Sequence, residues 1–157
     1  MAYSILFVCT GNVFRSMVAE HAMRTQLGPE SGYLVGSAGI EAKPQTIHPV
    51  ILARLMQKGA DPSLHLQRML TQEMVDRTDL IIAMGRNHRD LIQRNFSRAV
   101  PLFNEVSLGT DLPILDLHEA LPDWEQDLGK ARAYVESVID HIWNAVPLLL
   151  TRLPRFL

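Results

Sequence analysis

Residues 4–16 read SILFVCTGNVFRS, an apolar run followed at once by a short loop that contains glycine, asparagine and arginine. An apolar run as short as Ser4–Val8, bounded by turn-forming residues, is typical of a buried strand. Apolar residues then recur at helical spacing from about Ser16 to Leu27, where Gly28 and Pro29 supply a stop signal. The segment therefore predicts a strand, a tight loop and a helix in that order.

The rest of the chain repeats this alternation of short apolar runs and longer amphipathic stretches. Further strands are predicted at Tyr33–Ser37, Leu80–Met84 and Ala99–Leu102. Further helices are predicted at about 49–58, 87–94 and 129–145, the last of them ended by Pro147. Strands that alternate with helices in this way indicate a parallel sheet covered by helices on both faces.

Composition limits the possible functions of the chain. Its 157 residues make one domain, 1–157, and the single cysteine, Cys9, excludes an intramolecular disulfide or a multi-cysteine metal site. The 15 basic and 17 acidic residues give a net charge of −2, which predicts no nucleic-acid partner. The N-terminus does not resemble a signal peptide, and Val146–Leu150 is too short to span a bilayer. We expect a cytoplasmic protein without membrane insertion.

Parallel sheets bind ligands beyond the carboxyl ends of their strands, which selects the loops 9–16, 37–48 and 84–88. The first loop carries the chemistry. Gly11 and Asn12 accept left-handed dihedrals, while Arg15 offers a planar fork for two phosphate oxygens. Loop amides and a helix N-terminus favour a bound oxyanion and the thiolate form of Cys9, to which Ser16 can donate a hydrogen bond. A lone buried cysteine that acts only as a small apolar residue is the alternative.

The pattern VCTGNVFRS at residues 8–16 resembles the phosphate loop of the low-molecular-weight protein tyrosine phosphatases. The resemblance continues in SAG at 37–39, in GAD at 59–61 followed by His65, and in DLIIAM at 79–84 with His88. It implies a three-layer α/β/α fold with a four-stranded parallel sheet, which is flavodoxin-like and of the phosphotyrosine phosphatase I type. It also implies that Cys9 is the nucleophile and that Arg15 binds phosphate, with the loop completed by Thr10, Gly11, Asn12, Val13, Phe14 and Ser16.

The same resemblance implies a substrate, a partner and an absence of cofactors. The substrate would be a phosphotyrosine protein, and the bacterial branch that this chain resembles acts with tyrosine kinases of exopolysaccharide export. No cofactor and no metal are expected, and the other histidines lack metal-ligand spacing along the chain. The extension at 147–157 is expected to pack on the domain or to support weak self-association, so that the protein is a monomer or a weak homodimer.

The general acid is expected in the late acidic loop. The family carries it as the aspartate of an Asp-Pro-aromatic segment before the last helix, and Asp123 in LPDW at 121–124 fits best, with Asp116 as second choice. The aromatic residue often found after Ser-Ala-Gly is missing here. Trp124 is therefore expected to form the wall of the substrate site.

Two polar residues are expected to support the loop. Ser37 and His65 resemble the residues that hydrogen-bond Asn12 in the family and hold the loop in shape.

Phe14 stands where most members have a second cysteine that protects the nucleophile by a reversible disulfide. This chain therefore lacks that protection.

Three other functions remain to be weighed. Arsenate reduction on this fold needs additional cysteines, so one cysteine argues against it. Protein arginine phosphatases of this family tend to carry threonine at the position of Val13, so an apolar residue there favours phosphotyrosine. The altered acid segment leaves open a phosphate-binding or regulatory module with an impaired site.

Overall fold

The computed structural model describes residues 2–28 and 30–157. Three parallel strands form one sheet in the order β2-β1-β3, with β1 at Tyr3–Cys9, β2 at Tyr33–Gly39 and β3 at Leu80–Ala83. The register places Cys9 opposite Gly39 at the carboxyl edge of the sheet. The central strand β1 therefore delivers Cys9 to the edge at which parallel sheets bind ligands.

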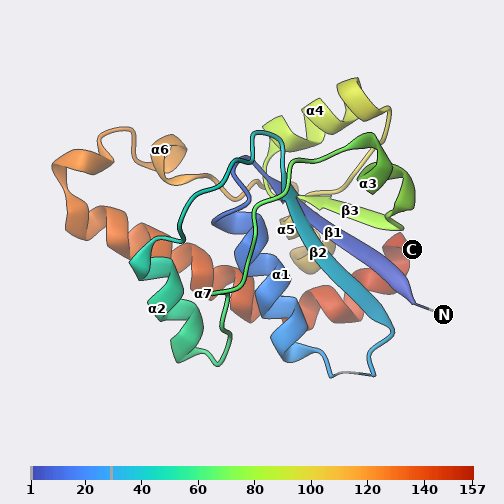
Figure 1. Ribbon diagram of the computed structural model, residues 1–157, viewed down its shortest axis with the longest axis horizontal. Coiled ribbons are helices and arrows are strands. Elements are labelled where there is room, and N and C mark those ends of the chain that lie inside the picture. The colour runs from blue at the N-terminus through green and yellow to red at the C-terminus, as the bar shows by residue number, and fades with distance from the viewer. Residues whose placement is uncertain (1, 29) are drawn as a thin grey trace.

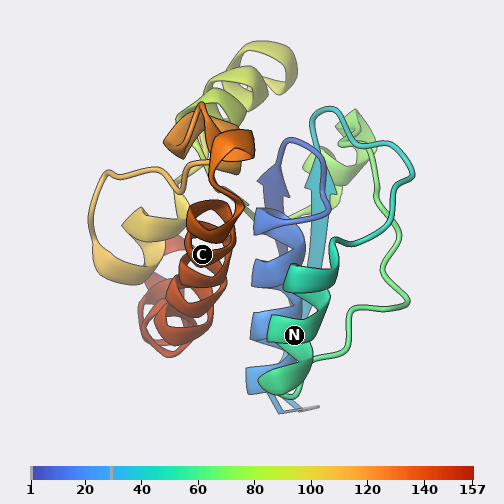
Figure 2. The same ribbon diagram turned by 90° about the vertical axis from the view of Figure 1, so that its left-hand side faces the viewer.

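Helices cover both faces of the sheet (Figure 1). One layer contains α1 (Arg15–Gln26), α2 (Pro49–Gln57), α5 (Phe103–Leu108) and the long α7 (Leu128–Arg152). The other contains α3 (Gln72–Arg77) and α4 (Arg86–Phe96). Three short elements complete the chain: α6 (Leu117–Ala120) and the 3-10 helices η1 (Trp124–Gln126) and η2 (Leu153–Phe156). Figure 2 shows α1 and α7 side by side, and these two helices are in direct contact. The predicted α/β architecture is confirmed.

Alternation along β1 divides the core into two clusters. Ile5, Phe7 and Cys9 face the layer of α1, α5 and α7, whereas Leu6 and Val8 face the layer of α3 and α4. Side chains in a strand point to opposite faces in turn, so a one-residue shift would turn Cys9 to the other face. The register of β1 thus points the thiol toward the start of α1.

The predicted fourth strand, Ala99–Leu102, does not form as a strand. A single parallel bridge joins Leu102 to Ala83, and Ala83 donates its N–H to the carbonyl of Pro101. Proline has no N–H to donate to a ladder, so pairing does not extend past Pro101. The sheet therefore has three strands within the described residues.

The prediction that the last helix ends at Pro147 is wrong. Helix α7 continues through Pro147 to Arg152. A proline inside a helix leaves the carbonyl four residues earlier without its usual donor, and that carbonyl belongs to Trp143. The side chain of Gln26, from α1, donates its Nε2–H to this oxygen at 3.0 Å. A neighbouring helix therefore replaces the missing hydrogen bond.

The C-terminal residues 147–157 pack against the domain. Leu149 and Leu153 are fully buried, and Arg152 donates its Nε–H to the carbonyl of Val106 in α5 at 2.8 Å. This segment is thus part of the core beside α5. None of the helices within the described residues has both the length and the apolar character needed to cross a bilayer.

Candidate active site

The loop between β1 and α1 forms the floor of the site. Cys9 ends β1 and is 2% exposed, and α1 begins at Arg15. Within the described part of the chain, the backbone N–H groups of residues 11–14 have no protein acceptor. Unpaired amides at the start of a helix are the usual arrangement for binding an oxyanion.

Asn12 gives the loop its sharp turn. Its φ of 55° lies in the left-handed region, which asparagine tolerates better than most residues. Gly11 was expected to share this conformation, but its φ is not positive. A single left-handed residue therefore suffices to reverse the chain above Cys9.

Four residues from three parts of the chain hold Asn12 in place. Its Nδ2 donates to Ser16 Oγ at 3.0 Å and to Ser37 Oγ at 2.8 Å. Its Oδ1 accepts the backbone N–H of Arg68 at 3.0 Å, and its carbonyl lies 2.7 Å from Nε2 of His65. The structure thus places Ser37 and His65 on Asn12, and Arg68 adds a contact that sequence reasoning did not identify.

Close packing against β2 also shapes the loop. A Cβ added to Gly39 would lie 2.5 Å from the carbonyl oxygen of Thr10 and 3.0 Å from the backbone nitrogen of Asn12. Both distances are shorter than the backbone can accommodate without moving. Glycine at the end of β2 is what lets the loop lie directly against the sheet.

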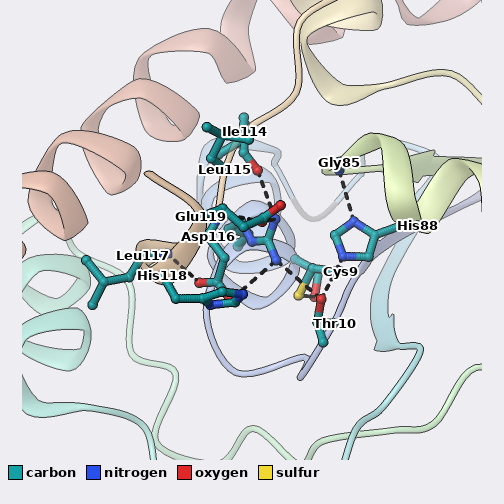
Figure 3. A network of polar contacts seen from close by, with 12 residues as sticks. Cys9, Thr10, Gly85, His88, Ile114, Leu115, Asp116, Leu117, His118 and Glu119 are labelled. Atoms are coloured by element: carbon teal, nitrogen blue, oxygen red, sulfur yellow. Dashed lines mark hydrogen bonds and ion pairs between the residues drawn. The ribbon is translucent and has the colours of Figure 1, made fainter. Parts of the chain in front are cut away.

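Arg15 reaches across the site although its side chain is only 2% exposed. Its Nη1 donates to the carbonyl of Ile114 at 2.9 Å. Its Nη2 lies 3.6 Å from Asp116 Oδ2, and Nη1 lies 3.7 Å from Glu119 Oε1. Figure 3 shows Asp116 and Glu119 on one side of this network and Cys9 and Thr10 on the other. These contacts therefore hold the Arg15 guanidinium in place beside the carboxylates of Asp116 and Glu119.

The segment that carries Asp116 is itself fixed at several points. Ile114 donates its N–H to the carbonyl of Met84 at 2.8 Å, which attaches the segment to the end of β3. The hydroxyl of Tyr134 in α7 donates to the carbonyl of Leu115. Asp116 Oδ1 accepts the N–H of Leu117 at 2.8 Å, at the start of α6. Asp116 thus faces the loop from an anchored stretch of backbone.

His88 supports the loop from the other side of the sheet. Its Nδ1 accepts the backbone N–H of Gly85 at 3.0 Å, so Nε2 carries the proton and donates to Thr10 Oγ1 at 2.9 Å. Burial and the positive charge of Arg15 lower the pKa of His88 to about 3. The ring is therefore neutral at physiological pH and acts as a fixed donor to Thr10.

Ser16 contacts the thiol directly. Its Oγ lies 2.9 Å from Cys9 Sγ and accepts a hydrogen bond from Asn12 Nδ2. The hydroxyl proton is then available to the sulfur, because this contact is shorter than the 3.4 Å to the carbonyl of Ala38. A donor at this distance stabilises a thiolate.

The structure brings Asp116, rather than Asp123, to the phosphate loop. Residues 117–126 form α6 and η1, which project away from the sheet (Figure 1). Asp123 is exposed and lines a separate hollow at residues 120–130. Among the described residues it has no side-chain hydrogen bond or ion pair. Helix α6 thus separates LPDW from Arg15, whereas Asp116 lies beside it, and the choice of the acid between these two aspartates stays a prediction.

An apolar cavity of about 440 Å³ opens beside the loop. Phe14 and Asp116 border it on the loop side, and Trp124 borders it from η1. Its remaining lining comes mainly from α2 and α7, namely His48, Val50, Ile51, Leu117, Leu128, Ala131, Arg132 and Val135. Trp124 and Asp116 thus border the same cavity.

Comparison with known proteins identifies the family. A model of the family described as low molecular weight phosphotyrosine protein phosphatase matches residues 4–155. The chain belongs to this family. A protein-arginine-phosphatase from Geobacillus stearothermophilus is 34% identical over 102 residues, which are 63% of this chain and 66% of that protein. A probable low molecular weight protein-tyrosine-phosphatase EpsP from Ralstonia solanacearum is 38% identical over 94 residues, which are 59% of this chain and 63% of that protein.

These curated relatives match over slightly less than two thirds of their own length. A solved structure extends the similarity over almost the whole chain. The YwlE arginine phosphatase from Geobacillus stearothermophilus has a TM-score of 0.79 at 27% sequence identity, and the match covers 98% of this chain and 94% of that one. The family resemblance drawn from the loop at residues 8–16 is confirmed.

Besides Arg68, three more residues make contacts at the site that sequence reasoning did not identify. Glu119 lies on α6, three residues after Asp116, and its carboxylate reaches Nη1 of Arg15 at 3.7 Å. The ring of His88 contacts the loop through Thr10. Glu20 accepts the hydroxyl of Ser37 at 2.5 Å. Glu20 is a buried acidic residue in the first helix after the loop, and this was the one signal by which the sequence could have pointed to it.

Proposed function

We propose that this protein is a phosphatase that hydrolyses phosphotyrosine through a phosphocysteine intermediate. The observation that carries the proposal is the geometry around Cys9. Its thiol lies under a loop of unpaired amides, 2.9 Å from the hydroxyl of Ser16, and the buried guanidinium of Arg15 flanks the same loop. These groups supply a nucleophile and an oxyanion site at one point.

In the first step the Cys9 thiolate attacks phosphorus. A phosphorus–sulfur bond forms as the bond from phosphorus to the leaving oxygen breaks. The loop amides and Arg15 stabilise the equatorial oxygens, whose charge must be held throughout the transfer. The hydroxyl of Ser16 stabilises the negative charge on Cys9 Sγ before the attack and again when the phosphorus–sulfur bond breaks.

We assign proton transfer to Asp116 in place of Asp123. As a carboxylic acid it gives its proton to the leaving phenolate oxygen. As a carboxylate it then takes a proton from the water that attacks phosphorus, and the phosphorus–sulfur bond breaks to return the thiolate. Its position at the edge of the apolar cavity and 3.6 Å from Arg15 supports this role. A well-placed acid contributes on the order of 10²–10⁴-fold.

The cavity beside the loop favours an aromatic substrate. Its lining is mostly apolar, and Trp124 offers an indole face on which a phenyl ring can stack. Val13 adds an apolar side chain to the loop. A phosphotyrosine ring would bury its apolar surface here, with its ester oxygen on the side of Asp116.

Phosphoarginine is the second candidate substrate. Asp116 and Glu119 place two carboxylates next to the loop, and carboxylates can pair with a guanidinium. A relative named a protein-arginine-phosphatase also favours this substrate. The mostly apolar cavity and Val13 lead us to rank phosphotyrosine first.

The physiological substrate that we propose is a protein, namely a tyrosine kinase of an exopolysaccharide export system. The resemblance of this chain to the bacterial branch that acts with such kinases, and a relative named a probable low molecular weight protein-tyrosine-phosphatase, support this assignment. Incubation of the phosphorylated kinase with the protein should remove its phosphotyrosine, whereas a Cys9→Ser variant should leave it in place.

Turnover of matched peptides tests the proposal. Phosphotyrosine peptides should be hydrolysed faster than phosphoarginine peptides, and phosphoserine peptides should be poor substrates. Cys9→Ser should abolish all turnover. A bell-shaped dependence of rate on pH is expected for an enzyme that needs a thiolate and a protonated acid. Phosphate binding without turnover would instead identify a binding module.

A further inference from the structure

A second cluster of reactive side chains lies behind the phosphate loop. Glu20 and His21 on α1 and His65 from the segment after α2 each offer one ligand atom, and these atoms lie within 4.8 Å of one another. A cavity of about 280 Å³ is bordered by all three and by Asp61. The cluster is thus accessible from solvent and separate from the substrate cavity beside Phe14 and Trp124.

The hydrogen bond of His65 fixes its tautomer. Its Nε2 lies 2.7 Å from the carbonyl oxygen of Asn12, and a carbonyl can only accept. Nε2 therefore carries the proton, and Nδ1 keeps a free lone pair. Histidines that ligate metals usually donate their other N–H to a carbonyl or a carboxylate in just this way.

His21 supplies an unsatisfied atom. Its Nε2 is buried and has no hydrogen-bond partner within the described residues. Leaving a buried polar atom unpaired lowers stability, so such atoms call for an explanation. Its ring meets the ring of His65 edge to face, with centroids 5.7 Å apart. The two imidazoles are therefore held close together from different segments.

Glu20 brings a negative charge that is almost fully buried. Its Oε1 accepts the hydroxyl of Ser37, and its Oε2 lies 3.0 Å from Nη1 of Arg24. Arg24 is also attached to the carbonyl of Val35 through Nε and Nη2, at 3.1 and 2.7 Å. Each carboxylate oxygen has a second lone pair, so Glu20 can accept a cation without releasing Ser37.

We propose that Glu20, His21 and His65 form a binding site for a divalent transition-metal ion of the Zn²⁺ type. Two imidazoles and one carboxylate suit Zn²⁺, and three protein ligands leave one position for water. Hard cations such as Mg²⁺ prefer oxygen ligands and are excluded by this donor set. The proposal goes beyond phosphatase activity and does not depend on it.

Metal binding would affect the phosphate loop through one hydrogen bond, from His65 to Asn12. An ion on Nδ1 of His65 keeps Nε2–H directed at the carbonyl of Asn12, which holds the left-handed turn. Binding of the ion to the folded state alone also raises the unfolding temperature. The metal would therefore stabilise the loop from behind without entering the substrate site.

Direct binding in a Cys9→Ser background tests the site, because this change removes the thiolate as a competing ligand. Competition of the protein with a chromophoric chelator for Zn²⁺ should give one ion per chain. Adding His21→Ala should weaken the affinity at least tenfold, since a metal ligand is lost. His118→Ala, which removes an exposed imidazole elsewhere, should leave the affinity unchanged.

Thermal unfolding gives a second readout that does not involve catalysis. Zn²⁺ should raise Tm of the Cys9→Ser protein, and Mg²⁺ should not. The rise should vanish in the His21→Ala protein, or in His21→Gln if the alanine variant is poorly folded. Failure of the Cys9→Ser protein to bind Zn²⁺, or equal affinity with and without His21, would overturn the site. Either result would leave the phosphatase proposal intact.

Discussion

Arg15 Nη2 and Asp116 Oδ2 lie 3.6 Å apart, which joins the start of α1 to the segment that follows β3 and α5. The contact places a carboxyl group over the phosphate loop at the edge of the apolar cavity. Asp123 lies seven residues further along, on the far side of α6. The two aspartates therefore have different expected roles.

Asp116→Asn should lower kcat for an aryl phosphate by about 10²–10⁴-fold, because the leaving oxygen loses its proton donor. The exposed Asp123→Asn is the matched control and should retain nearly full turnover. Steady-state hydrolysis of para-nitrophenyl phosphate measures both. A large loss in Asp123→Asn with a small loss in Asp116→Asn would return the acid role to Asp123.

Stability should depend on pH through His88. Its pKa of about 3 in the folded protein lies below the ordinary value of 6.5, so below pH 6.5 the unfolded chain binds a proton that the folded chain does not. The free energy of unfolding should therefore fall as pH drops from 6.5, by on the order of 3 kcal/mol at pH 4. Urea unfolding at several pH values measures this loss.

A His88→Gln variant isolates that contribution. Its free energy of unfolding should change less between pH 6.5 and pH 4 than that of the wild type. Identical slopes for His88→Gln and the wild type would show that His88 is not the group responsible.

Gly39→Ala should damage the loop from the neighbouring strand. The new methyl group would lie 2.5 Å from the carbonyl oxygen of Thr10, so the loop must move away from β2. We expect a loss of about 1–3 kcal/mol in stability and a large loss of activity. Gly129→Ala, whose methyl would meet no atom closer than 3.6 Å, should leave activity unchanged. Activity and Tm of both variants should be measured together to test this expectation. Full activity in Gly39→Ala would contradict the packing argument.

The proline in α7 predicts a coupling between two helices. Gln26→Met should cost about 1–2 kcal/mol, because the carbonyl of Trp143 loses its donor. In a Pro147→Ala background residue 147 can donate its own N–H to this carbonyl, so the same substitution should cost much less. A double-mutant cycle by chemical unfolding measures the difference. Additive losses would show that the side chain of Gln26 does not serve this purpose.

Oxidation should inactivate the protein irreversibly. Cys9 is the only cysteine, and Phe14 occupies the position at which the family usually carries its partner. With no second thiol in the chain, sulfenic acid on Cys9 can pass to sulfinic acid, which thiols do not reduce. Activity should not recover when dithiothreitol follows peroxide. Full recovery would contradict this expectation.

Local patterns predicted much of the fold because its main elements are marked by local sequence. The apolar run before Cys9 and the spacing of apolar residues in α1 identify strand, loop and helix directly. Pro147 was misread because the donor that compensates for it, Gln26, lies in another helix. Ala99–Leu102 was misread as a strand because a proline is compatible with a strand at the edge of a sheet. In the structure the segment forms only one bridge, between Leu102 and Ala83.

The site was predictable to the extent that it lies on consecutive residues. The residue types close together in this one loop predict an anion site, namely Cys9, Asn12, Arg15 and Ser16. The acid that we propose, Asp116, was only the second choice from sequence, since its place beside Arg15 depends on how the chain folds between β3 and α7. The spacing of Glu20 and His21 along the chain gave no sign of His65, which only the folded chain brings close.

The support of Asn12 has a consequence for how the protein is made. Groups from residues 16, 37, 65 and 68 must all be in place before the turn above Cys9 is held. Ile114 and Asp116 complete the surroundings of Arg15 later still. During translation Cys9 is therefore made before the groups that surround it, and its cradle is complete only after Asp116 has also emerged.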